Sequence, residues 1–235
     1  MTRSGAEIRR LDLGYFVRPA SETGGEHPRV EPVYGYLVRR DEGLLLFDTG
    51  IGAADPETEA HYRPRRRPLA EALAAAGVRA EEIALVVNCH LHFDHCGENP
   101  RFAGTPIVVQ RRELATARGA DYIFPELVDF PSARYEQLDG AAELWPGVLV
   151  LPTAGHSAGH QSLAVRQPDG TVLLAGQARD TASIFAADVL ARRAAAEGVA
   201  APLPPVPPWL SQILDLDPAR VLFAHDGSVW EPVSR

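Results

Sequence analysis

Short apolar runs bounded by turn residues dominate the first half of the chain and predict strands. Residues 8–16 alternate loosely between apolar and polar side chains, as a half-buried strand does. The apolar runs 34–38 and 44–47 flank a polar stretch that ends in Gly43, which predicts a hairpin. Further buried strands are predicted at residues 83–87 and 105–109.

Three stretches predict helices. Residues 68–76 begin with Pro68 and are followed by Gly77, the usual start and stop residues of a helix. Residues 111–117 and the alanine-rich 182–197 predict the other two. Later strands are predicted at residues 148–151, 162–165, 171–175 and 221–224. Hairpins mixed with helices indicate an α/β (α+β) architecture with layers α/β/β/α.

Proline, glycine and aromatic clusters predict the loops. Residues 18–32 contain three prolines, and residues 119–138 combine aromatic side chains with two prolines, so both are predicted to be irregular. Residues 202–208 are proline-dense and predicted to be extended. Arg63 and the neighbouring run Arg65-Arg66-Arg67 are predicted to lie in a solvated loop.

The composition is that of an ordinary globular chain. With 235 residues, 46% of them hydrophobic and 23% charged, it is predicted to form one domain over residues 1–235 without a disulfide framework. No apolar run approaches the roughly 18 residues that a membrane span needs, and the N-terminus lacks an apolar signal-peptide stretch. We therefore expect a cytoplasmic protein without a membrane partner. The net charge of −8 disfavours nucleic acid, whose phosphates would be repelled.

Candidate chemistry concentrates in one short stretch after the predicted strand at 83–87. Four side chains fit the pattern H-x-H-x-D-H within six residues: His90, His92, Asp94 and His95. Imidazole nitrogens and carboxylate oxygens suit Zn²⁺, Fe²⁺ or Mn²⁺. On a loop, alternate side chains can converge on one point while the residues between them face elsewhere. A polar surface loop that holds these histidines by chance is the alternative, and so compact a cluster argues against it.

Three small residues surround this motif. Cys89 and Cys96 flank it, but thiolates suit structural zinc sites better than hydrolytic ones. Both cysteines are therefore predicted to be buried packing residues. Gly97 is predicted to allow a sharp turn after the last motif residue.

On this motif the chain resembles the metallo-β-lactamase superfamily of metallohydrolases. Three further segments, each after a predicted strand, are similar to elements of that superfamily: Asp48-Thr49-Gly50, Gly155-His156-Ser157 and Ala224-His225-Asp226. Within the superfamily the sequence most resembles the N-acyl-homoserine lactonases, through residues 90–95, 106–110 and 155–162. The likeness extends from about residue 33 to the C-terminus.

The resemblance implies a metallo-β-lactamase-like αββα sandwich with two mixed β-sheets flanked by helices. It also implies two metal ions, expected to be zinc, with iron or manganese as alternatives. His90, His92 and His156 would hold the first ion, and Asp94, His95 and His225 the second. Two such cations can share a hydroxide, which supplies a nucleophile without a serine or cysteine. Asp94 would be both a ligand and the proton carrier to the leaving oxygen.

Gln177 departs from the superfamily pattern, and it is a candidate metal ligand because the resemblance places it at the usual bridging position. The superfamily places a metal-bridging aspartate after the strand at 171–175, where this chain has a neutral glutamine that bridges cations poorly. Asp180 lies three residues on, where the lactonases carry a substrate-contacting tyrosine. Either Asp180 reaches the metals as a partial replacement, or it faces the substrate. In either case we expect the second metal to be held weakly.

Other candidates have plainer predicted roles. His160 and Asp48 are predicted to be hydrogen-bond partners that orient the ligands. Asp226 either orients His225 or caps the next turn. His61 is predicted to be a surface residue. Three aromatic residues either line a substrate pocket or close a core: Trp209, Tyr122 and Phe124.

These features predict a metal-dependent hydrolase of an ester-like bond, most simply a lactone, that acts through a metal-bound hydroxide on a small, partly apolar substrate. A thioester hydrolase or a cyclase of natural-product metabolism is the alternative enzyme. A catalytically weak metal-binding homologue is the alternative outside catalysis. Nothing in the sequence indicates the oligomeric state.

Overall fold

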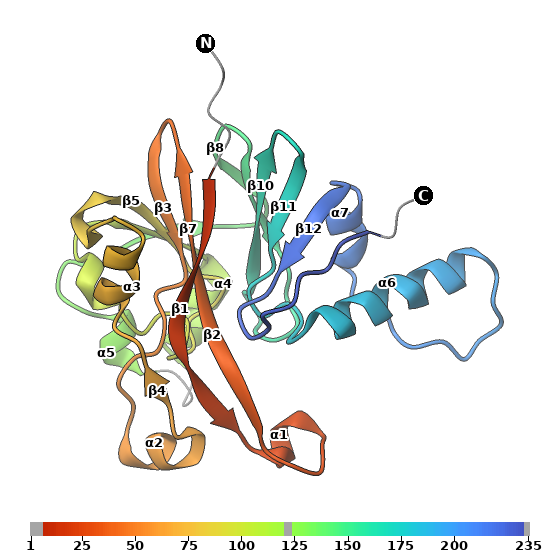
Figure 1. Ribbon diagram of the computed structural model, residues 1–235, viewed down its shortest axis with the longest axis horizontal. Helices are drawn as coiled ribbons and strands as arrows, with labels where there is room; N and C mark the ends of the chain where they lie inside the picture. The colour runs from red at the N-terminus through yellow and green to blue at the C-terminus, as the bar shows by residue number, and fades with distance from the viewer. Residues whose placement is uncertain (1–6, 120–123, 233–235) are drawn as a thin grey trace.

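The computed structural model describes residues 7–119 and 124–232, whose strands form two mixed sheets that pack face to face (Figure 1). The larger sheet contains, in spatial order, β4 (Arg65–Arg66), β1 (Glu7–Arg18), β2 (Arg29–Arg40), β3 (Gly43–Phe47), β5 (Ile83–Val87), β6 (Pro106–Gln110) and β7 (Arg134–Leu138). The smaller sheet contains β12 (Pro218–Leu222), β11 (Gly170–Leu174), β10 (Gln161–Gln167), β9 (Val148–Pro152) and β8 (Ala142–Trp145). Neighbours from β3 to β7 are parallel, as are β11 and β12.

Alternating side chains on the central strands explain the layers, because successive residues of a strand point to opposite faces. On β3, Leu45 and Phe47 join the cluster between the sheets, whereas Leu44 and Leu46 join the cluster on the outer face. Both faces of such a strand are buried, so its sequence is a continuous apolar run. The predicted strands at 44–47 and 83–87 are confirmed for this reason.

Helices cover the outer face of each sheet. On the larger sheet these are α3 (Leu69–Ala75), α4 (Arg111–Ala117) and α5 (Pro125–Val128), and on the smaller sheet α6 (Ala182–Ala196) and α7 (Leu210–Leu214). The shorter elements are α1 (Ala20–Thr23), α2 (Pro56–Tyr62) and the 3₁₀ turns η1 (Ala80–Glu82) and η2 (Asn99–Phe102). The predicted α/β/β/α layering and the three predicted helices are confirmed.

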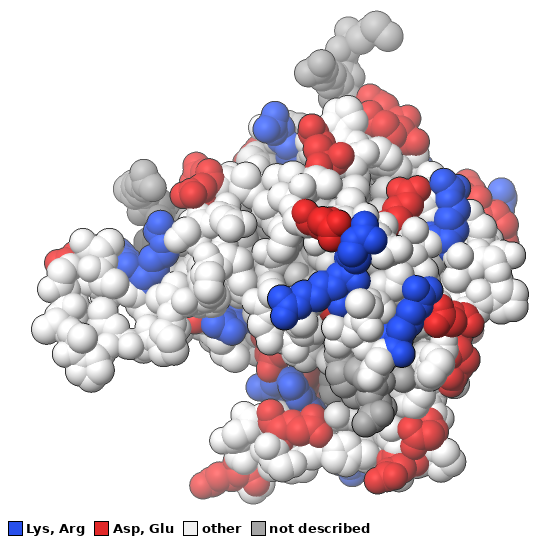
Figure 2. Space-filling view, turned by 180° about the vertical axis from the view of Figure 1, so that it is seen from behind, with Lys and Arg blue, Asp and Glu red and all other residues white. Residues whose placement is uncertain are grey.

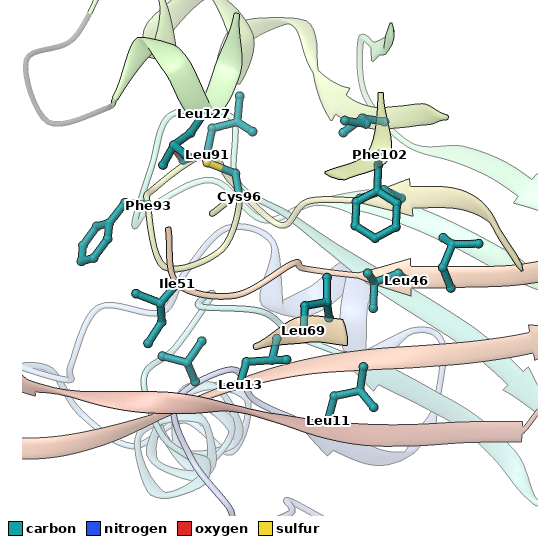
Figure 3. Close-up of a cluster of buried hydrophobic side chains, with 14 of the residues drawn as sticks. Leu11, Leu13, Leu46, Ile51, Leu69, Leu91, Phe93, Cys96, Phe102 and Leu127 are labelled. Carbon is teal, nitrogen blue, oxygen red and sulfur yellow. Dashed lines mark hydrogen bonds between the residues drawn. The ribbon is translucent and has the colours of Figure 1, made fainter. Parts of the chain in front are cut away.

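The loop that carries the H-x-H-x-D-H motif is anchored in the outer core of the larger sheet. Leu91, Phe93 and Cys96, which alternate with the polar motif residues, lie in the same apolar cluster as Leu69 and Phe102 (Figure 3). Leu91 and Cys96 are therefore fully buried in this core while the polar residues face elsewhere, as predicted, and Phe93 also borders the cleft described below.

Parts of the predicted loops are wrong. β2 begins at Arg29, inside the predicted loop 18–32, and the segment 119–138 contains α5 and β7. β7 is an edge strand whose side chains are mostly exposed or half-buried, so it lacks the apolar signal of an interior strand. The last strand is Pro218–Leu222 rather than 221–224, and residues 223 and 224 lead from it to the site.

The arginine-rich segment is also more ordered than predicted. Arg65 and Arg66 pair with β1 as the short strand β4. The Arg66 guanidinium donates to the Gly52 carbonyl oxygen and forms an ion pair with Glu59. Elsewhere, acidic and basic side chains are interspersed on the face shown in Figure 2. None of the helices in the described ranges combines the length and apolar character that a membrane crossing requires.

Candidate metal centre

The candidate residues meet where several strands end. Asp48 follows β3 and the motif follows β5, two parallel neighbours whose ends lie at one edge of the larger sheet. Gln177 and His225 follow β11 and β12, which are parallel neighbours in the smaller sheet. His156 lies in the loop from β9 to β10. The fold thereby brings segments that are far apart in the sequence to one place.

Backbone hydrogen bonds fix the motif loop against the segment after β3. The amides of Thr49 and Gly52 donate to the carbonyls of His95 and Phe93 at 2.7 and 2.6 Å. Gly97 lies so close to this segment that a Cβ there would sit 1.8 Å from the Gly52 nitrogen. Close packing, rather than the predicted sharp turn, is therefore the reason for glycine at this position.

Asp94, His95 and His225 form one set of converging donor atoms, the aspartate-containing group. Nε2 of His95 lies 3.1 Å from Nε2 of His225. Oδ2 of Asp94 lies 3.4 Å from each of these nitrogens. All three side chains are buried.

The outer nitrogens of the two rings show how the inner ones face. Nδ1 of His225 lies 2.9 Å from the Pro32 carbonyl oxygen, and Nδ1 of His95 lies 3.0 Å from Oδ2 of Asp48. Carbonyl and carboxylate oxygens only accept hydrogen bonds, so both Nδ1 atoms carry the hydrogen in neutral rings. The two Nε2 lone pairs then face each other beside a carboxylate oxygen. Three acceptors in this arrangement fit a bound cation.

His90, His92 and His156 form the other set, the three-histidine group. One nitrogen of each ring lies within 4.8 Å of the other two, and Nδ1 of His92 is 3.1 Å from Nε2 of His156. Nε2 of His90 is buried and has no hydrogen-bond partner in the described part of the chain. A buried polar atom without a partner is costly. A cation held by the three rings would supply that partner, so these residues also fit a metal ion.

The two groups differ in protonation. Burial, together with repulsion from neighbouring imidazoles, lowers the pKa of His92 to about 4 and that of His156 to about 3. Burial also lowers the pKa of His95, but the carboxylates of Asp94 and Asp48 outweigh it and raise that pKa to about 9. Without a metal at neutral pH, the His95 ring therefore carries a second proton and a positive charge, whereas the rings of His92 and His156 are neutral.

Glu113 has no motif around it that predicts a role, yet its buried carboxylate joins two ligand loops. It accepts hydrogen bonds from the Leu91 amide at 3.0 Å, the Ser157 hydroxyl at 2.7 Å and the Gly159 amide at 3.0 Å. A Cβ at Gly159 would lie 2.3 Å from the Glu113 nitrogen, so glycine is required for this approach. Leu91 lies within the motif, and the other two donors follow His156. Glu113 thus fixes both loops of the three-histidine group.

Residues 155–159 also fit the pattern G-x-S-x-G, which elsewhere presents a nucleophilic serine on a turn from a strand into a helix. Here the segment links two strands, β9 and β10. Ser157 is buried, and its hydroxyl donates to Glu113. This context indicates a loop-fixing serine rather than a nucleophile.

Asp48 and His160 lie directly behind the donor groups. Besides its contact with His95, the Asp48 carboxylate accepts a hydrogen bond from the Cys89 amide at 2.8 Å. Nδ1 of His160 lies 2.8 Å from the Thr153 hydroxyl, and its Nε2 accepts a hydrogen bond from the backbone amide of Gln177 at 3.0 Å. Asp48 thus contacts a donor ring, whereas the hydrogen bonds of His160 reach Thr153 and the Gln177 backbone, so its predicted role stays a prediction.

Asp226 and the cysteines have structural surroundings. The Asp226 carboxylate accepts hydrogen bonds from the backbone amides of Ala182, at the start of α6, and Ser228, both at 2.9 Å. This favours the capping alternative for Asp226.

Cys89 and Cys96 are fully buried, and burial raises the pKa of both thiols well above the ordinary value. They are therefore protonated at neutral pH, consistent with packing residues.

Asp180 occupies neither of its two predicted positions. Its Oδ2 accepts hydrogen bonds from Arg18 at 2.9 Å and Arg29 at 3.5 Å, and its Oδ1 accepts one from Nε2 of Gln177 at 3.2 Å. Among the described residues, Asp180 belongs to no set of converging donors and does not line the cleft described next. Its two arginine partners hold it where it is.

A cleft of about 610 Å³ opens over the donor groups. Its wall includes His92, Asp94 and His156, together with Gln177. Four aromatic side chains line it: Phe16, Tyr62, Phe93 and Phe124. The other lining residues are polar: Arg18, Glu22, Asp55, Glu57, Thr58 and His61. The cleft thus combines donor atoms with an aromatic wall.

The cleft settles several of the remaining predictions. His61 is exposed, as predicted for a surface residue, and it also lines the cleft, where it lies 2.7 Å from Oε1 of Glu22. Phe124 lines the cleft, whereas Trp209 is buried in the core beside the smaller sheet. Tyr122 lies outside the described residues.

A family model and curated relatives both match this chain. The model of the family described as the metallo-beta-lactamase superfamily matches residues 28–225. An N-acyl homoserine lactonase from Bacillus cereus is 34% identical over 175 residues, which cover 67% of this chain and 68% of that protein. The N-acyl homoserine lactonase AttM of Agrobacterium fabrum is 33% identical over 166 residues, covering 61% of this chain and 63% of that protein.

Solved structures agree with the sequence comparison. An N-acyl homoserine lactone hydrolase with the product N-hexanoyl-L-homoserine at its catalytic metal centre superposes with a TM-score of 0.77 and 26% identity. The match covers 97% of this chain and 95% of that one. A quorum-quenching lactonase, AidC, shares the fold with a TM-score of 0.68 at 15% identity, covering 100% of this chain and 96% of that one.

Proposed function

The chain belongs to the metallo-β-lactamase superfamily, and we propose that it is a metal-dependent lactonase whose substrate is a lactone with a partly apolar acyl substituent, such as an N-acyl homoserine lactone. One observation carries this proposal: six buried or cleft-lining side chains point their donor atoms into two groups below a cleft with an aromatic wall. Its relatives named above are lactonases, which supports the choice of substrate class.

We assign one metal ion to each donor group, with zinc as the expected ion and iron or manganese as alternatives. Three neutral imidazoles form the ligand set of hydrolytic zinc sites that keep an open position, and the aspartate-containing group adds one negative charge. When bound, such cations polarise a carbonyl and lower the pKa of water, so that a nucleophile is available at neutral pH. Elemental analysis of protein purified without added metal identifies the ion.

Asp94 is the residue proposed to move the proton. Burial raises the pKa of Asp94, but the adjacent imidazoles of His95 and His225 lower it by more, so the net shift is downward. The carboxylate is therefore ionised at neutral pH and accepts a proton from the attacking water. Asp94 lines the cleft, where it can pass that proton to the ring oxygen as the acyl–oxygen bond breaks. One water is consumed, and the product is the open hydroxy acid.

The aromatic wall is proposed to bind the acyl chain. Phe16 and Tyr62 pack edge to face with ring centroids 5.7 Å apart, and Phe93 lies 5.8 Å from Tyr62 and 5.9 Å from Phe124. The four rings therefore form a continuous apolar surface in the cleft. Burial of an alkyl chain against such a surface stabilises binding by roughly 0.8 kcal/mol per CH₂ group.

Hydrolysis of N-hexanoyl homoserine lactone by Asp94→Asn tests this function. Because the amide cannot carry the proton, kcat should fall by about 10²–10⁴-fold. The matched control is Asp139→Asn, which alters an exposed carboxylate paired with Arg111 and should keep the parent rate. A parent-level rate in Asp94→Asn would contradict the role of Asp94. Turnover of thioesters but of no lactone by the parent would favour the alternative thioester hydrolase.

A further inference from the structure

Gln177 stands between the aspartate-containing group and a network of charged side chains. It is only 5% exposed. On one side it lines the cleft together with Asp94 of this group. On the other side its Nε2 donates to Oδ1 of Asp180 at 3.2 Å. The orientation of this one carboxamide therefore decides which atom, oxygen or nitrogen, faces the donor group.

The partners of Asp180 fix it as an ionised acceptor. Arg18, on β1, donates to its Oδ2 at 2.9 Å, and Arg29, on β2, lies 3.5 Å from the same oxygen. Arg29 also donates to the buried carboxylate of Glu31 at 2.7 Å. Glu31 Oε2 lies 3.6 Å from Arg18, so the two arginines are held from both sides. Asp180 is thus tied to the β1–β2 hairpin and cannot approach the donor groups without breaking these ion pairs.

An ionised carboxylate accepts hydrogen bonds and donates none. Gln177 must therefore present its NH₂ to Asp180, and the carbonyl oxygen of the same planar amide is turned to the opposite side. That side is the cleft wall, which Gln177 shares with Asp94 and which does not include Asp180. A flipped amide would place two oxygens against each other at Asp180 and would present N–H donors to the cation site.

We propose that Asp180 is a positioning residue: anchored by Arg18 and Arg29, it turns the carbonyl oxygen of Gln177 toward the aspartate-containing group, where that oxygen serves as a neutral metal donor. This inference rests on the metal centre of the proposed function. It also changes the expectation for this position, because the negative charge at residue 180 stays outside the donor group and acts through the amide. Gln177 supplies an oxygen without a charge.

Zinc affinity of the aspartate-containing group tests the proposal without any assay of activity. Zinc is competed against a chromophoric chelator, and the binding step that disappears in His225→Ala is assigned to this group. Asp180→Asn keeps the shape of the side chain but allows its NH₂ to face Gln177, which favours the flipped amide. We expect zinc to bind this step about 10–100-fold more weakly, the usual effect of losing a partner that orients a ligand.

Two further variants separate positioning from a general loss of structure. In a Gln177→Leu background there is no amide to orient, so Asp180→Asn should change the affinity by less than about twofold. The matched control is Asp188→Asn, which removes the ion-pair partner of Arg179 beside Asp180 without touching Gln177. It should bind zinc as the parent does. If Asp180→Asn fails to fold, Asp180→Ala, which frees the amide to rotate, should weaken the same step.

Each result of the zinc titrations either supports or overturns the proposed role of Asp180. Weaker zinc binding in Asp180→Asn that vanishes in the Gln177→Leu background supports the proposal. An equal loss in both backgrounds, or no loss in the parent background, overturns it while leaving the metal centre intact. A parent protein that binds neither zinc nor iron nor manganese would overturn the proposed function, and this inference with it.

Discussion

The two donor groups use similar side chains but are supported in different ways. In the aspartate-containing group, the outer nitrogens of His95 and His225 each contact an oxygen acceptor, supplied by Asp48 and by the Pro32 carbonyl. In the three-histidine group, the strongest support is Glu113, which binds backbone amides and a hydroxyl of the loops rather than a ring. Asp48 and the Pro32 carbonyl therefore orient individual side chains, whereas Glu113 positions whole loops.

The groups also differ in exposure and charge. The aspartate-containing group is buried and includes a carboxylate, with a second carboxylate directly behind it. In the three-histidine group two of the three rings line the cleft, and none of its ligands is charged at neutral pH. From this difference we propose that a metal ion in the three-histidine group would be the more accessible to a substrate, and that one in the aspartate-containing group would be the more enclosed. Variants that affect one group and spare the other test this division.

The largest effect is expected from removing one ligand from each group. His156→Ala should lose the metal of the three-histidine group and His225→Ala that of the aspartate-containing group, because each variant lacks one of the imidazole nitrogens on which its site depends. Elemental analysis should show one equivalent fewer in each variant. The fold should survive, because a domain of this size does not depend on metal for its core. Unchanged stoichiometry in both variants would refute the assignment.

A smaller effect is expected from the supporting carboxylates. Asp48→Asn should weaken only the metal of the aspartate-containing group, and Glu113→Gln only that of the three-histidine group. Each should cost about 10–100-fold in affinity, because an NH₂ replaces one oxygen that accepts hydrogen bonds. Metal titration of the two variants should therefore give complementary losses. Equal losses at both sites in either variant would show that the supports are not separate.

The number of protons released on metal binding should also distinguish the two donor groups. The pKa of His95 is raised to about 9 in the metal-free protein, so at pH 7.5 its ring is charged and must lose a proton when metal binds. His92 and His156, with pKa values of about 4 and 3, are already neutral. Calorimetry in buffers of different ionisation enthalpy measures the protons released when metal binds. His156→Ala keeps the aspartate-containing group and should release close to one proton. His225→Ala keeps the three-histidine group and should release close to none. The release should fade as the pH rises through 9. The reverse assignment would contradict this account.

The smallest effect is expected from the thiol that touches both groups. The Cys89 sulfur lies 3.1 Å from Nδ1 of His90 and 3.3 Å from Nδ1 of His95. Its thiol is protonated at neutral pH, so Cys89→Ser should keep both metals, with a change in affinity below the tenfold expected for the carboxylates. A full equivalent lost in Cys89→Ser would show that the thiol is itself a ligand.

Much of the site could be predicted because its ligands are local in the sequence or stand at strand ends. Four donors lie within six residues, and His225 follows a short apolar run that favours a buried strand, although the strand itself ends at Leu222. The residues that hold the ligands in place, such as Asp180 and Glu113, could not be predicted, because each acts through a contact between distant segments. Arg18 meets Asp180 across 162 positions, and nothing near Glu113 marks it as the partner of two loops.

The fold shows the same division. Interior strands buried on both faces were evident as apolar runs, whereas the exposed edge strand β7 carried no such signal. Gly97 illustrates how a correct residue can have a different cause. The sequence pattern predicts a turn at Gly97, but the close approach of Gly52 is what excludes a side chain there.

The most direct test of the two-group centre is anomalous diffraction at the zinc edge from crystals of the protein loaded with zinc. The account predicts two peaks, one among the imidazoles of His90, His92 and His156, and one among Asp94, His95 and His225. A single peak shared by the two groups, or zinc bound elsewhere with both groups empty, would contradict it.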